Sequence, residues 1–364
     1  MGSEGMRNAV RTPALILDID ILDQNIATMA AMAKSMGVLF RPHAKAHKCV
    51  NIAQRLHRAG AVGACCATIG EAEALASGGI TGLLITSPLI TSDQIQRLGR
   101  LLSHSADVAV VADHPRNIDA YAQLAKSKGG QLEVLIDFDF GQGRTGCCSV
   151  EEAVALAELI ARYPSLKLLG VQAYWGHLQQ VVPMSERQRL VGEQQERLRG
   201  VIRALTSVGH VPEIVSGAGT GTHGMDGNSG LFTEIQPGSF LFMDSCYDVS
   251  LTSESGNPFT PSLFVAASVV SANHPGRVIV NAGLKAFATD SGKPKPWRGA
   301  PTGATYRFMG DEHGAVEFDG QGPGLADTIE FLTSHCDPTV NLHSAFHVVR
   351  GDEVVDIWPI TGRY

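Results

Sequence analysis

The sequence predicts an α/β protein that combines a (β/α)8 TIM-type barrel with a carboxyl-terminal, mostly β domain. Eight short apolar runs alternate with helical patterns up to about residue 250, and long helical patterns then cease. The chain of 364 residues has room for both parts, because such a barrel takes about 250 residues. We expect residues 20–250 to form the barrel, and residues 1–19 to join 251–364 in the β domain.

The predicted barrel strands are apolar runs without polar alternation, a pattern typical of parallel strands buried on both faces. They lie at residues 38–40, 63–67, 82–86, 107–112, 132–136, 166–174, 213–216 and 234–242. One predicted helix between them buries Leu22, Ile26, Met29, Ala30 and Ala33. Another is capped by Ser185 and buries Leu190, Leu198, Val201, Ile202 and Leu205. The alternative is a doubly wound open sheet, because the sequence does not give the strand order.

The predicted β domain consists of short β-like runs that Gly, Pro and Asp turns separate. These runs lie at residues 265–270, 277–280, 306–308, 315–317, 328–332, 346–350 and 353–357. A further strand at residues 14–18 precedes the first helix, and it fits either domain.

Composition narrows the class of protein. The net charge is -7 and no long basic cluster occurs, so nothing indicates binding to nucleic acid or to an anionic membrane. No apolar run approaches the ~18 residues of a membrane span. Residues 1–10 lack the apolar core of a secretory signal, so we expect a cytoplasmic protein. Seven cysteines without a CxxC pair are expected to be reduced thiols.

The densest chemical signal is the segment Arg41–Lys48, which directly follows the first barrel strand and holds five basic or imidazole side chains. The carboxyl ends of barrel strands form the active site in enzymes of this fold. A lysine beside other cations, such as Lys45, can be a neutral amine that attacks an aldehyde. The alternative is a solvated basic loop.

A glycine-rich loop, Ser216–Thr222, directly follows the seventh predicted strand, and Gln236–Ser239 lies in the region of the eighth. Loops after strands seven and eight of a barrel commonly bind phosphate through backbone N–H groups. A flexible glycine loop is the alternative.

Three further motifs carry polar side chains. His335 and Asp337 follow a predicted strand, would share one face if it continued, and suit Mn, Mg, Co or Zn. The alternative is a hydrogen-bonded loop pair. Arg144 lies in a glycine-flanked turn after the fifth strand and could contact an anion or a phenolate. Tyr174 and His177, at the end of the sixth strand, suit a planar ligand or simple packing.

Together these stretches resemble the D-threonine aldolase and D-serine dehydratase family of fold-type III, alanine-racemase-like enzymes, which use pyridoxal 5'-phosphate (PLP). The resemblance runs from Arg11 to Trp358. It implies a Schiff base on Lys45, Arg144 near the phenolic oxygen of PLP and Tyr174 near the pyridine nitrogen. The remaining predicted cofactor contacts are His43, Ser216, Gly219, Thr220, Gly221, Thr222, Gly238 and Ser239.

The resemblance also implies that His335 and Asp337 bind a divalent metal. The aldolase branch reads His-x-Asp-Pro-Thr, as residues 335–339 do, whereas the dehydratase branch typically has Cys at the second ligand. A head-to-tail homodimer is implied as well. Two positions depart from the family. Gln180 stands where its aldolases carry a His, and Asn281 replaces an Asp.

These features predict cleavage of a D-β-hydroxy-α-amino acid into glycine and an aldehyde. His177 or a metal-bound hydroxide is the predicted base for the β-hydroxyl, with His313 and Gln180 as predicted substrate contacts. The nearest rival is a metal-dependent dehydratase that gives a keto acid and ammonia. A racemase would leave the metal pair idle. A non-enzymatic PLP-binding protein is the rival from a different class, although such single-domain barrels lack a β domain.

Overall fold

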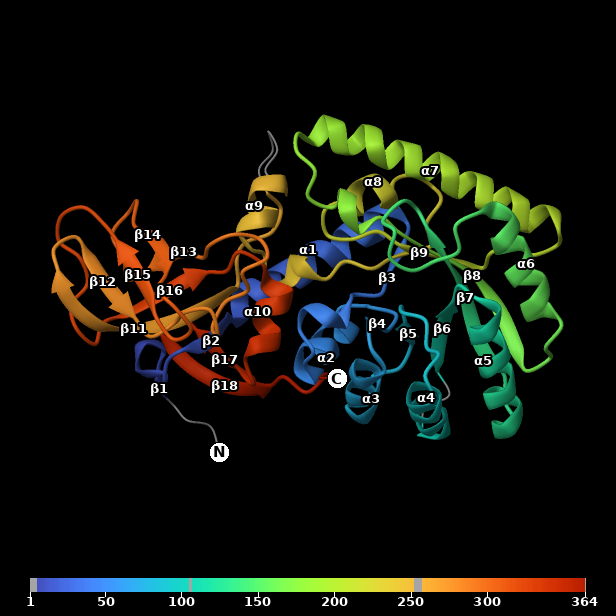
Figure 1. Ribbon diagram of the computed structural model, residues 1–364, viewed down its shortest axis with the longest axis horizontal. Helices are drawn as coiled ribbons and strands as arrows, with labels where there is room; N and C mark the ends of the chain where they lie inside the picture. Colours follow the sequence, from blue (N-terminus) through green and yellow to red (C-terminus); the bar gives the residue numbers. More distant parts are fainter. Residues whose placement is uncertain (1–4, 105–106, 252–256, 364) are drawn as a thin grey trace. The chain divides into compact units, whose positions relative to one another are not determined.

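The computed structural model describes residues 5–104, 107–251 and 257–363 (Figure 1). Its contacts divide the chain into two compact units. The barrel unit comprises the described residues of Met29–Lys45, Val50–Gly238 and Gly362–Tyr364. The β unit comprises those of Met1–Thr28, Ala46–Cys49 and Ser239–Thr361. The short segment 46–49 therefore groups with the β unit, although Lys45 groups with the barrel.

The barrel unit contains an eight-stranded parallel sheet in the order β3-β10-β9-β8-β7-β6-β5-β4. A parallel bridge between His43 and Cys65 joins the chain after β3 to β4 and connects the two edges of the sheet. The (β/α)8 prediction is thereby confirmed, and the open doubly wound sheet is excluded. The strands are β3 (Leu39–Phe40), β4 (Ala64–Cys66), β5 (Leu83–Ile85), β6 (Val108–Ala112), β7 (Leu132–Asp139), β8 (Leu166–Tyr174), β9 (Ile214–Gly217) and β10 (Glu234–Ile235).

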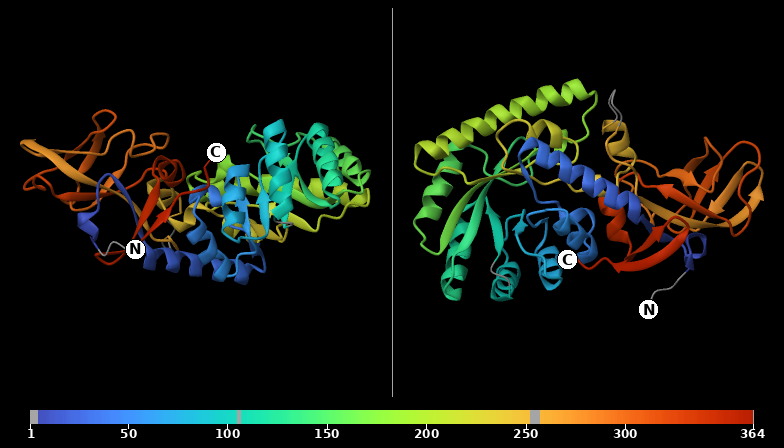
Figure 2. Two further views of the ribbon diagram at one scale, coloured as in Figure 1. Left: turned by 90° about the horizontal axis from the view of Figure 1, so that it is seen from below. Right: turned by 180° about the vertical axis from the view of Figure 1, so that it is seen from behind.

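Helices connect these strands and lie along the outside of the sheet (Figures 1 and 2). They are α2 (Val50–Arg58), α3 (Ile69–Ser77), α4 (Ser92–His104), α5 (Pro115–Lys128), α6 (Val150–Ala161), α7 (Met184–Ser207) and α8 (His223–Gly227). Helix α1 (Ile19–Met36) precedes β3, and its first residues group with the β unit. The prediction that Ser185 caps the long helix is wrong. Pro183 is the cap residue of α7, and Ser185 lies inside its first turn, since proline is well accommodated at a helix start.

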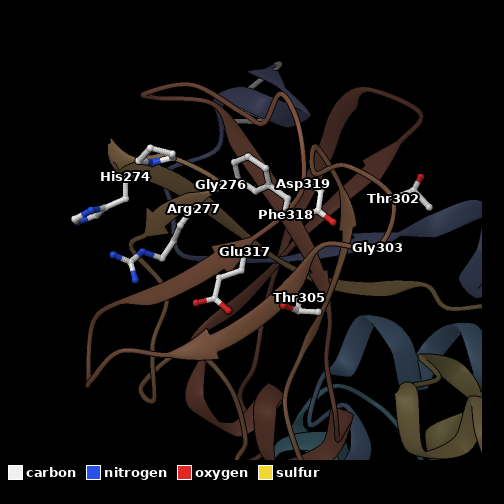
Figure 3. A pocket seen from close by; sticks show the side chains of 10 residues that line it. His274, Gly276, Arg277, Thr302, Gly303, Thr305, Glu317, Phe318 and Asp319 are labelled. Carbon is white, nitrogen blue, oxygen red and sulfur yellow. The ribbon is translucent and has the colours of Figure 1, made fainter.

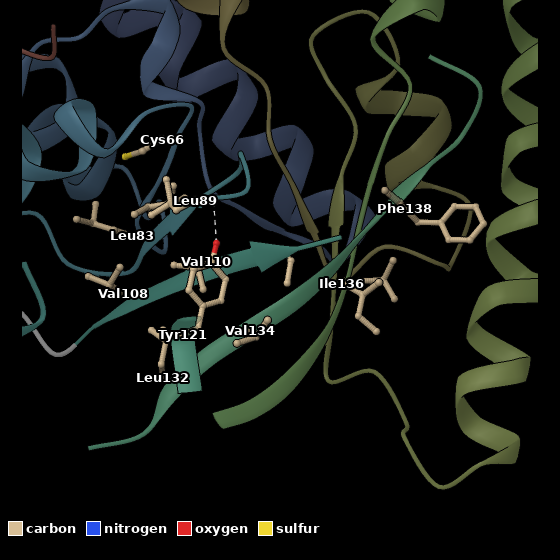
Figure 4. Packing of buried hydrophobic residues seen from close by; sticks show 14 of the residues in the cluster. Cys66, Leu83, Leu89, Val108, Val110, Tyr121, Leu132, Val134, Ile136 and Phe138 are labelled. Atoms are coloured by element: carbon tan, nitrogen blue, oxygen red, sulfur yellow. Dashed lines mark hydrogen bonds between the residues drawn. The ribbon is translucent and has the colours of Figure 1, made fainter. Parts of the chain in front are cut away.

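The barrel strands are buried on both faces because successive side chains alternate between the barrel interior and the helix layer. Leu84, Val111 and Leu135 belong to one small cluster, together with Cys65 and Leu169. Their chain neighbours belong to a second, larger cluster with the helices, which includes Leu83, Val110, Val134 and Ile136 (Figure 4). This two-sided burial explains why the strands lack polar alternation.

The β unit is a ten-stranded sheet whose main path has the order β1-β18-β17-β2-β11-β12-β15-β14. Strand β2 (Ala14–Asp18) pairs with β11 and β17, so the strand that fitted either domain belongs to the β unit. The other strands are β1 (Gly5–Met6), β11 (Leu263–His274), β12 (Arg277–Val280), β13 (Lys295–Arg298), β14 (Thr305–Phe308), β15 (Gly314–Glu317), β16 (Thr328–Leu332), β17 (Ala345–Arg350) and β18 (Glu353–Pro359).

Two helices of the β unit were not expected from the sequence: α9 (Ser245–Leu251) and α10 (Cys336–Leu342). Within the described residues, the structure has no helix long and apolar enough to cross a bilayer. All seven cysteines are free, in agreement with the prediction of reduced thiols.

Tyr121 offers a test of how the barrel unit is stabilised. Its side chain is fully buried, and its hydroxyl accepts from Leu89 N at 2.8 Å and donates to Val111 O at 3.1 Å (Figure 4). Tyr121→Phe leaves both backbone groups without this partner, so we expect a loss of about 1–3 kcal/mol in the free energy of unfolding. Urea denaturation measures this loss.

Tyr163→Phe is the control, because the Tyr163 hydroxyl donates to Asp119 in a partly exposed site. Its effect should be clearly smaller. Equal stability of Tyr121→Phe and the parent protein would contradict this account of the core.

Candidate active site

The Lys45 segment continues directly from β3 at the carboxyl end of the parallel sheet. His43 N donates to Pro237 O at 3.0 Å, which fixes the start of the segment against the chain after β10. The next turn is a short 3-10 helix, Ala44–Ala46. Lys45 is half-buried, and its Nζ lies 5.6 Å from the centroid of the Tyr174 ring. A primary amine and an aromatic face thus lie together at the strand ends, where barrel enzymes have their active sites.

The His43 side chain supports the turn that contains Lys45. Its Nδ1 accepts from Lys45 N at 3.4 Å, so Nε2 carries the proton and donates to Thr86 Oγ1 at 3.2 Å. Thr86 in turn donates to Cys66 O. His43 is buried, and it holds the lysine turn in place because its Nδ1 accepts from Lys45 N.

The alternative of a solvated basic loop is excluded by burial. His43, His47 and Lys48 are all buried. Burial lowers the pKa of His47 to about 3, so this imidazole is neutral. Arg41 forms a bidentate ion pair with Glu234, with both nitrogen–oxygen distances at 2.9 Å. Two of the five basic groups are thus satisfied without any external anion.

Arg144 approaches the same aromatic ring as Lys45. Its Cζ lies 5.6 Å from the Tyr174 centroid, and the side chain is exposed. The turn that carries it is preformed, since Asp139 Oδ1 accepts from the backbone amides of residues 141–143. Thr145 Oγ1 donates to Asp137, a carboxyl whose pKa burial raises. The structure therefore brings Lys45, Tyr174 and Arg144 together.

The glycine-rich loop after β9 is built against Gln179, a residue that the sequence analysis missed. Gly221 N donates to Gln179 Oε1 at 2.9 Å, and Gln179 Nε2 donates to Thr222 Oγ1 at 3.1 Å. A Cβ on Gly221 would lie 1.8 Å from Gln179 O, and one on Gly219 would lie 2.4 Å from Gln179 Oε1. Both glycines are thus required by close approach. Pairing of a glycine loop with a buried glutamine has no local sequence signal.

Two predicted phosphate contacts have hydroxyls that are already engaged. Ser216 Oγ donates to Glu234 Oε1 at 2.6 Å and accepts from Gln236 Nε2 at 2.8 Å. Thr222 Oγ1 accepts from Gln179 Nε2 at 3.1 Å and lies near Asp226, whose pKa burial raises to about 7. These side chains hold the glycine-rich loop in place through their hydrogen bonds.

The site fits a phosphate through its backbone. Ala218, Gly238 and Ser239 are buried residues, and their amides make no hydrogen bond within the described part of the chain. Buried N–H groups normally have a partner, so they are suited to an anion. With the Lys45 amine and the Tyr174 ring, the donor set fits PLP.

His335 and Asp337 do not continue a strand, so that expectation was wrong. His335 is the cap residue of α10 and Asp337 lies in its first turn. The reason is local, because Asp-Pro at the second and third helical positions favours a helix start. Both residues still belong to one unit, the β unit.

The donor chemistry of this pair fits a divalent cation. His335 Nδ1 contacts Asp290 Oδ2 at 2.6 Å, so Nε2 remains available. Asp337 uses Oδ1 to accept from Ser239 at 3.3 Å, so Oδ2 remains available. Neither remaining atom has a partner in the described part of the chain. Among the described residues, no group of three His, Cys, Asp or Glu side chains is arranged to hold a metal ion.

His47 is a second residue that the sequence analysis left without a role. It is fully buried in the β unit, and its Nδ1 accepts from Cys49 N at 3.0 Å. Its Nε2 therefore carries a proton, and it has no partner among the described residues. The negative charge of Asp337 acts on this imidazole, so the two lie near each other.

The predicted substrate contacts are exposed. His177 lies on the 3-10 helix Gly176–Leu178, and Gln180 follows it. His313 lies in the turn before β15, where its carbonyl accepts from Met309 N. Asn281, the other departure from the family pattern, has a structural role. Its Oδ1 accepts from Ser268 N and its Nδ2 donates to Thr12.

One pocket lies entirely within the β unit and contains none of the predicted site residues. It has a volume of about 670 Å³ and is formed by the ends of β11, β12, β14 and β15 (Figure 3). Its lining is polar, with the side chains of His274, Arg277, Glu317 and Asp319 around it (Figure 3). The candidate site is therefore defined by chemistry at strand ends and not by pocket size.

Two family models match successive parts of the chain. Residues 17–246 match the family model of the alanine racemase N-terminal domain, and residues 262–349 match that of a serine dehydratase domain. The chain is 36% identical to a 3-hydroxy-D-aspartate aldolase of Paracoccus denitrificans (strain Pd 1222), over 97% of this chain and 92% of that one. It is 37% identical to a D-threonine aldolase of Arthrobacter sp, over 97% and 93% of the two chains.

Among solved structures, D-threonine aldolase from Filomicrobium marinum has a TM-score of 0.95 at 37% identity, covering 99% of this chain and 98% of that chain. The fold and the strand-end site define an alanine-racemase-like enzyme. Within that class, the chain belongs to the D-threonine aldolase and D-serine dehydratase family of PLP enzymes, and it is a lyase.

The glycine loop supplies a test of cofactor binding. Gly221→Ala forces a Cβ against the backbone of Gln179, so we expect the loop to shift and the affinity for PLP to fall by about tenfold or more. Titration of the apoprotein with PLP, followed by visible absorbance, measures this affinity.

Gly224→Ala is the matched control, because a Cβ there meets nothing within 4 Å. It should retain the affinity of the parent protein. An unchanged affinity in Gly221→Ala would show that the loop has no part in holding the cofactor.

Proposed function

We propose that this protein catalyses the PLP- and divalent-metal-dependent retro-aldol cleavage of D-β-hydroxy-α-amino acids, such as D-threonine, to glycine and an aldehyde. The observation that carries the proposal is the grouping of the Lys45 amine, the Tyr174 ring and Arg144 at the carboxyl ends of the barrel strands. The aldolase relatives at 36% and 37% identity support the same reaction.

In this proposal the barrel unit holds the cofactor. Lys45 supplies the amine for the aldehyde, the amides of Ala218 and Gly238 bind the phosphate, and Tyr174 and Arg144 contact the ring. Bound PLP withdraws electrons from the α-carbon of an attached amino acid and so stabilises the charge left when the bond to the β-carbon breaks. Because His43 fixes the backbone of the lysine turn, the Lys45 amine stays close to the Tyr174 ring.

The proposal assigns the metal to His335 Nε2 and Asp337 Oδ2. A divalent ion there, such as Mn, Mg, Co or Zn, would lower the pKa of the substrate β-hydroxyl. Two protein ligands leave coordination positions for water and substrate. The aspartate at the second ligand position supports the aldolase reaction over the dehydratase one, since the resemblance associates Cys with the latter.

The proton of the β-hydroxyl requires an acceptor in the protein. We assign it to His177, whose exposed imidazole lies on the turn that also carries Gln179. Gln180 and His313 are proposed to contact the substrate. We further propose that the protein acts in the cytoplasm as a homodimer.

A product assay tests the function. The PLP-loaded protein is given D-threonine, D-phenylserine or 3-hydroxy-D-aspartate with and without Mn²⁺. We expect glycine and the matching aldehyde, and we expect chelation by EDTA to abolish turnover. Lys45→Ala should lower turnover by about 10²- to 10⁴-fold or more.

Lys167→Ala is the control, because Lys167 is a lysine of the barrel unit that pairs with Glu133 and Glu213 at the amino ends of the strands, away from the candidate site at the carboxyl ends. It should keep normal turnover. Ammonia and a keto acid as the products would instead identify a dehydratase, and PLP binding without any turnover would identify a binding protein.

A further inference from the structure

A segment of the β unit, residues 286–291, is fixed against helix α10. Ala288 N donates to Thr339 Oγ1 at 3.1 Å. The ring nitrogen Nε2 of His343, at the end of the same helix, donates to Ala286 O at 3.0 Å. The first half of the segment is therefore tied to the middle and to the carboxyl end of α10 by hydrogen bonds.

The same segment is anchored in the apolar core. Phe287 is almost completely buried, and its ring packs edge-on against Tyr306 at 5.5 Å and Phe331 at 5.6 Å between centroids. Because these partners lie on β14 and β16, the segment is held between the sheet and the helix. Asp290 is exposed, and it directly follows this anchored stretch of the chain.

The fixed loop sets Asp290 against the metal-ligand candidate on α10. Asp290 Oδ2 lies 2.6 Å from His335 Nδ1. His335 is itself restrained, since its carbonyl accepts from Thr339 Oγ1 at 2.7 Å. Thr339 therefore bonds the backbone of His335 and the backbone of Ala288, which lies two residues before Asp290. This arrangement specifies the ring orientation and makes Nδ1 the protonated nitrogen.

We infer that Asp290 is the positioning residue that orients His335 for metal binding. Histidine ligands commonly donate their second ring N–H to a carboxylate, which fixes the tautomer and raises the basicity of the ligating nitrogen. The inference rests on the proposed metal site at His335 and Asp337. The loop before Asp290 is held by the two hydrogen bonds to α10 and by the buried Phe287 ring. An incidental surface ion pair would not require such an anchored loop.

The test measures Mn²⁺ affinity directly and does not depend on turnover. The PLP-loaded protein is titrated with Mn²⁺, and the free ion is followed by its electron paramagnetic resonance signal. Asp290→Ala should weaken Mn²⁺ binding roughly 10- to 100-fold. Asp290→Asn keeps an acceptor for the ring N–H but lacks the charge, so its loss should be smaller.

The control is Asp319→Asn, which removes a carboxylate from the same unit at an exposed position with no hydrogen bond or ion pair in the described part of the chain. It should bind Mn²⁺ like the parent protein. Unchanged melting temperature and cofactor absorbance in the Asp290 variants exclude a general loss of structure.

The outcomes separate this inference from the function on which it rests. Parent-like Mn²⁺ affinity in both Asp290 variants would overturn the inference and leave the metal site standing. Failure of the parent protein itself to bind Mn²⁺ would overturn the metal site as well. Equal weakening in Asp319→Asn would mean that net charge and not orientation is responsible, which also overturns the inference.

Discussion

The ion pair between Arg41 and Glu234, near the amino ends of the barrel strands, is the interaction that ties together the strands carrying the candidate site. Both side chains line a small cavity with residues of β5 to β9, so they lie inside the barrel. Glu234 also accepts from Ser216, which links β10 to β9 as well as to the chain after β3. A buried carboxylate needs such partners, because an unpaired one is costly in a low dielectric. The pair therefore fixes, relative to one another, the three strands from which the lysine turn and the glycine loop extend.

The backbone and the side chains around the glycine loop and the lysine turn therefore have different roles. The hydroxyls and amides beneath the glycine loop, from Ser216 to Gln179, satisfy one another. Backbone N–H groups are left for a phosphate. His43 likewise serves the backbone of the lysine turn, which leaves the Lys45 amine and the Tyr174 ring as the chemically distinctive groups. A rigid barrel mouth of this kind orients a ligand mainly through backbone groups, and few of its side chains need to contact the ligand.

The fold could be predicted from the sequence because its signals are local. Each of the eight barrel strands overlaps a predicted apolar run, and β2, β8, β12 and β16 were predicted to the residue. The run 234–242 was wrong as a single strand, because only Glu234–Ile235 pairs and Ser239–Leu241 forms a 3-10 helix. Strand β13 was missed because Lys295–Arg298 contains Pro and two charges, and α10 was missed because a seven-residue helix has little periodicity. Of the site, Lys45, Arg144 and Tyr174 could be predicted from position after a strand. Gln179, Asp226 and Asp290 could not, because their roles depend on contacts between segments distant in sequence.

The central claim is that the barrel mouth presents the Lys45 amine to an aldehyde cofactor. Reduction of the PLP-loaded protein with borohydride, followed by proteolysis and mass spectrometry, tests it most directly. The account predicts one pyridoxyl group on the peptide that contains Lys45 and loss of the visible absorbance. A protein that stays colourless with added PLP, or a label on another lysine, would contradict it.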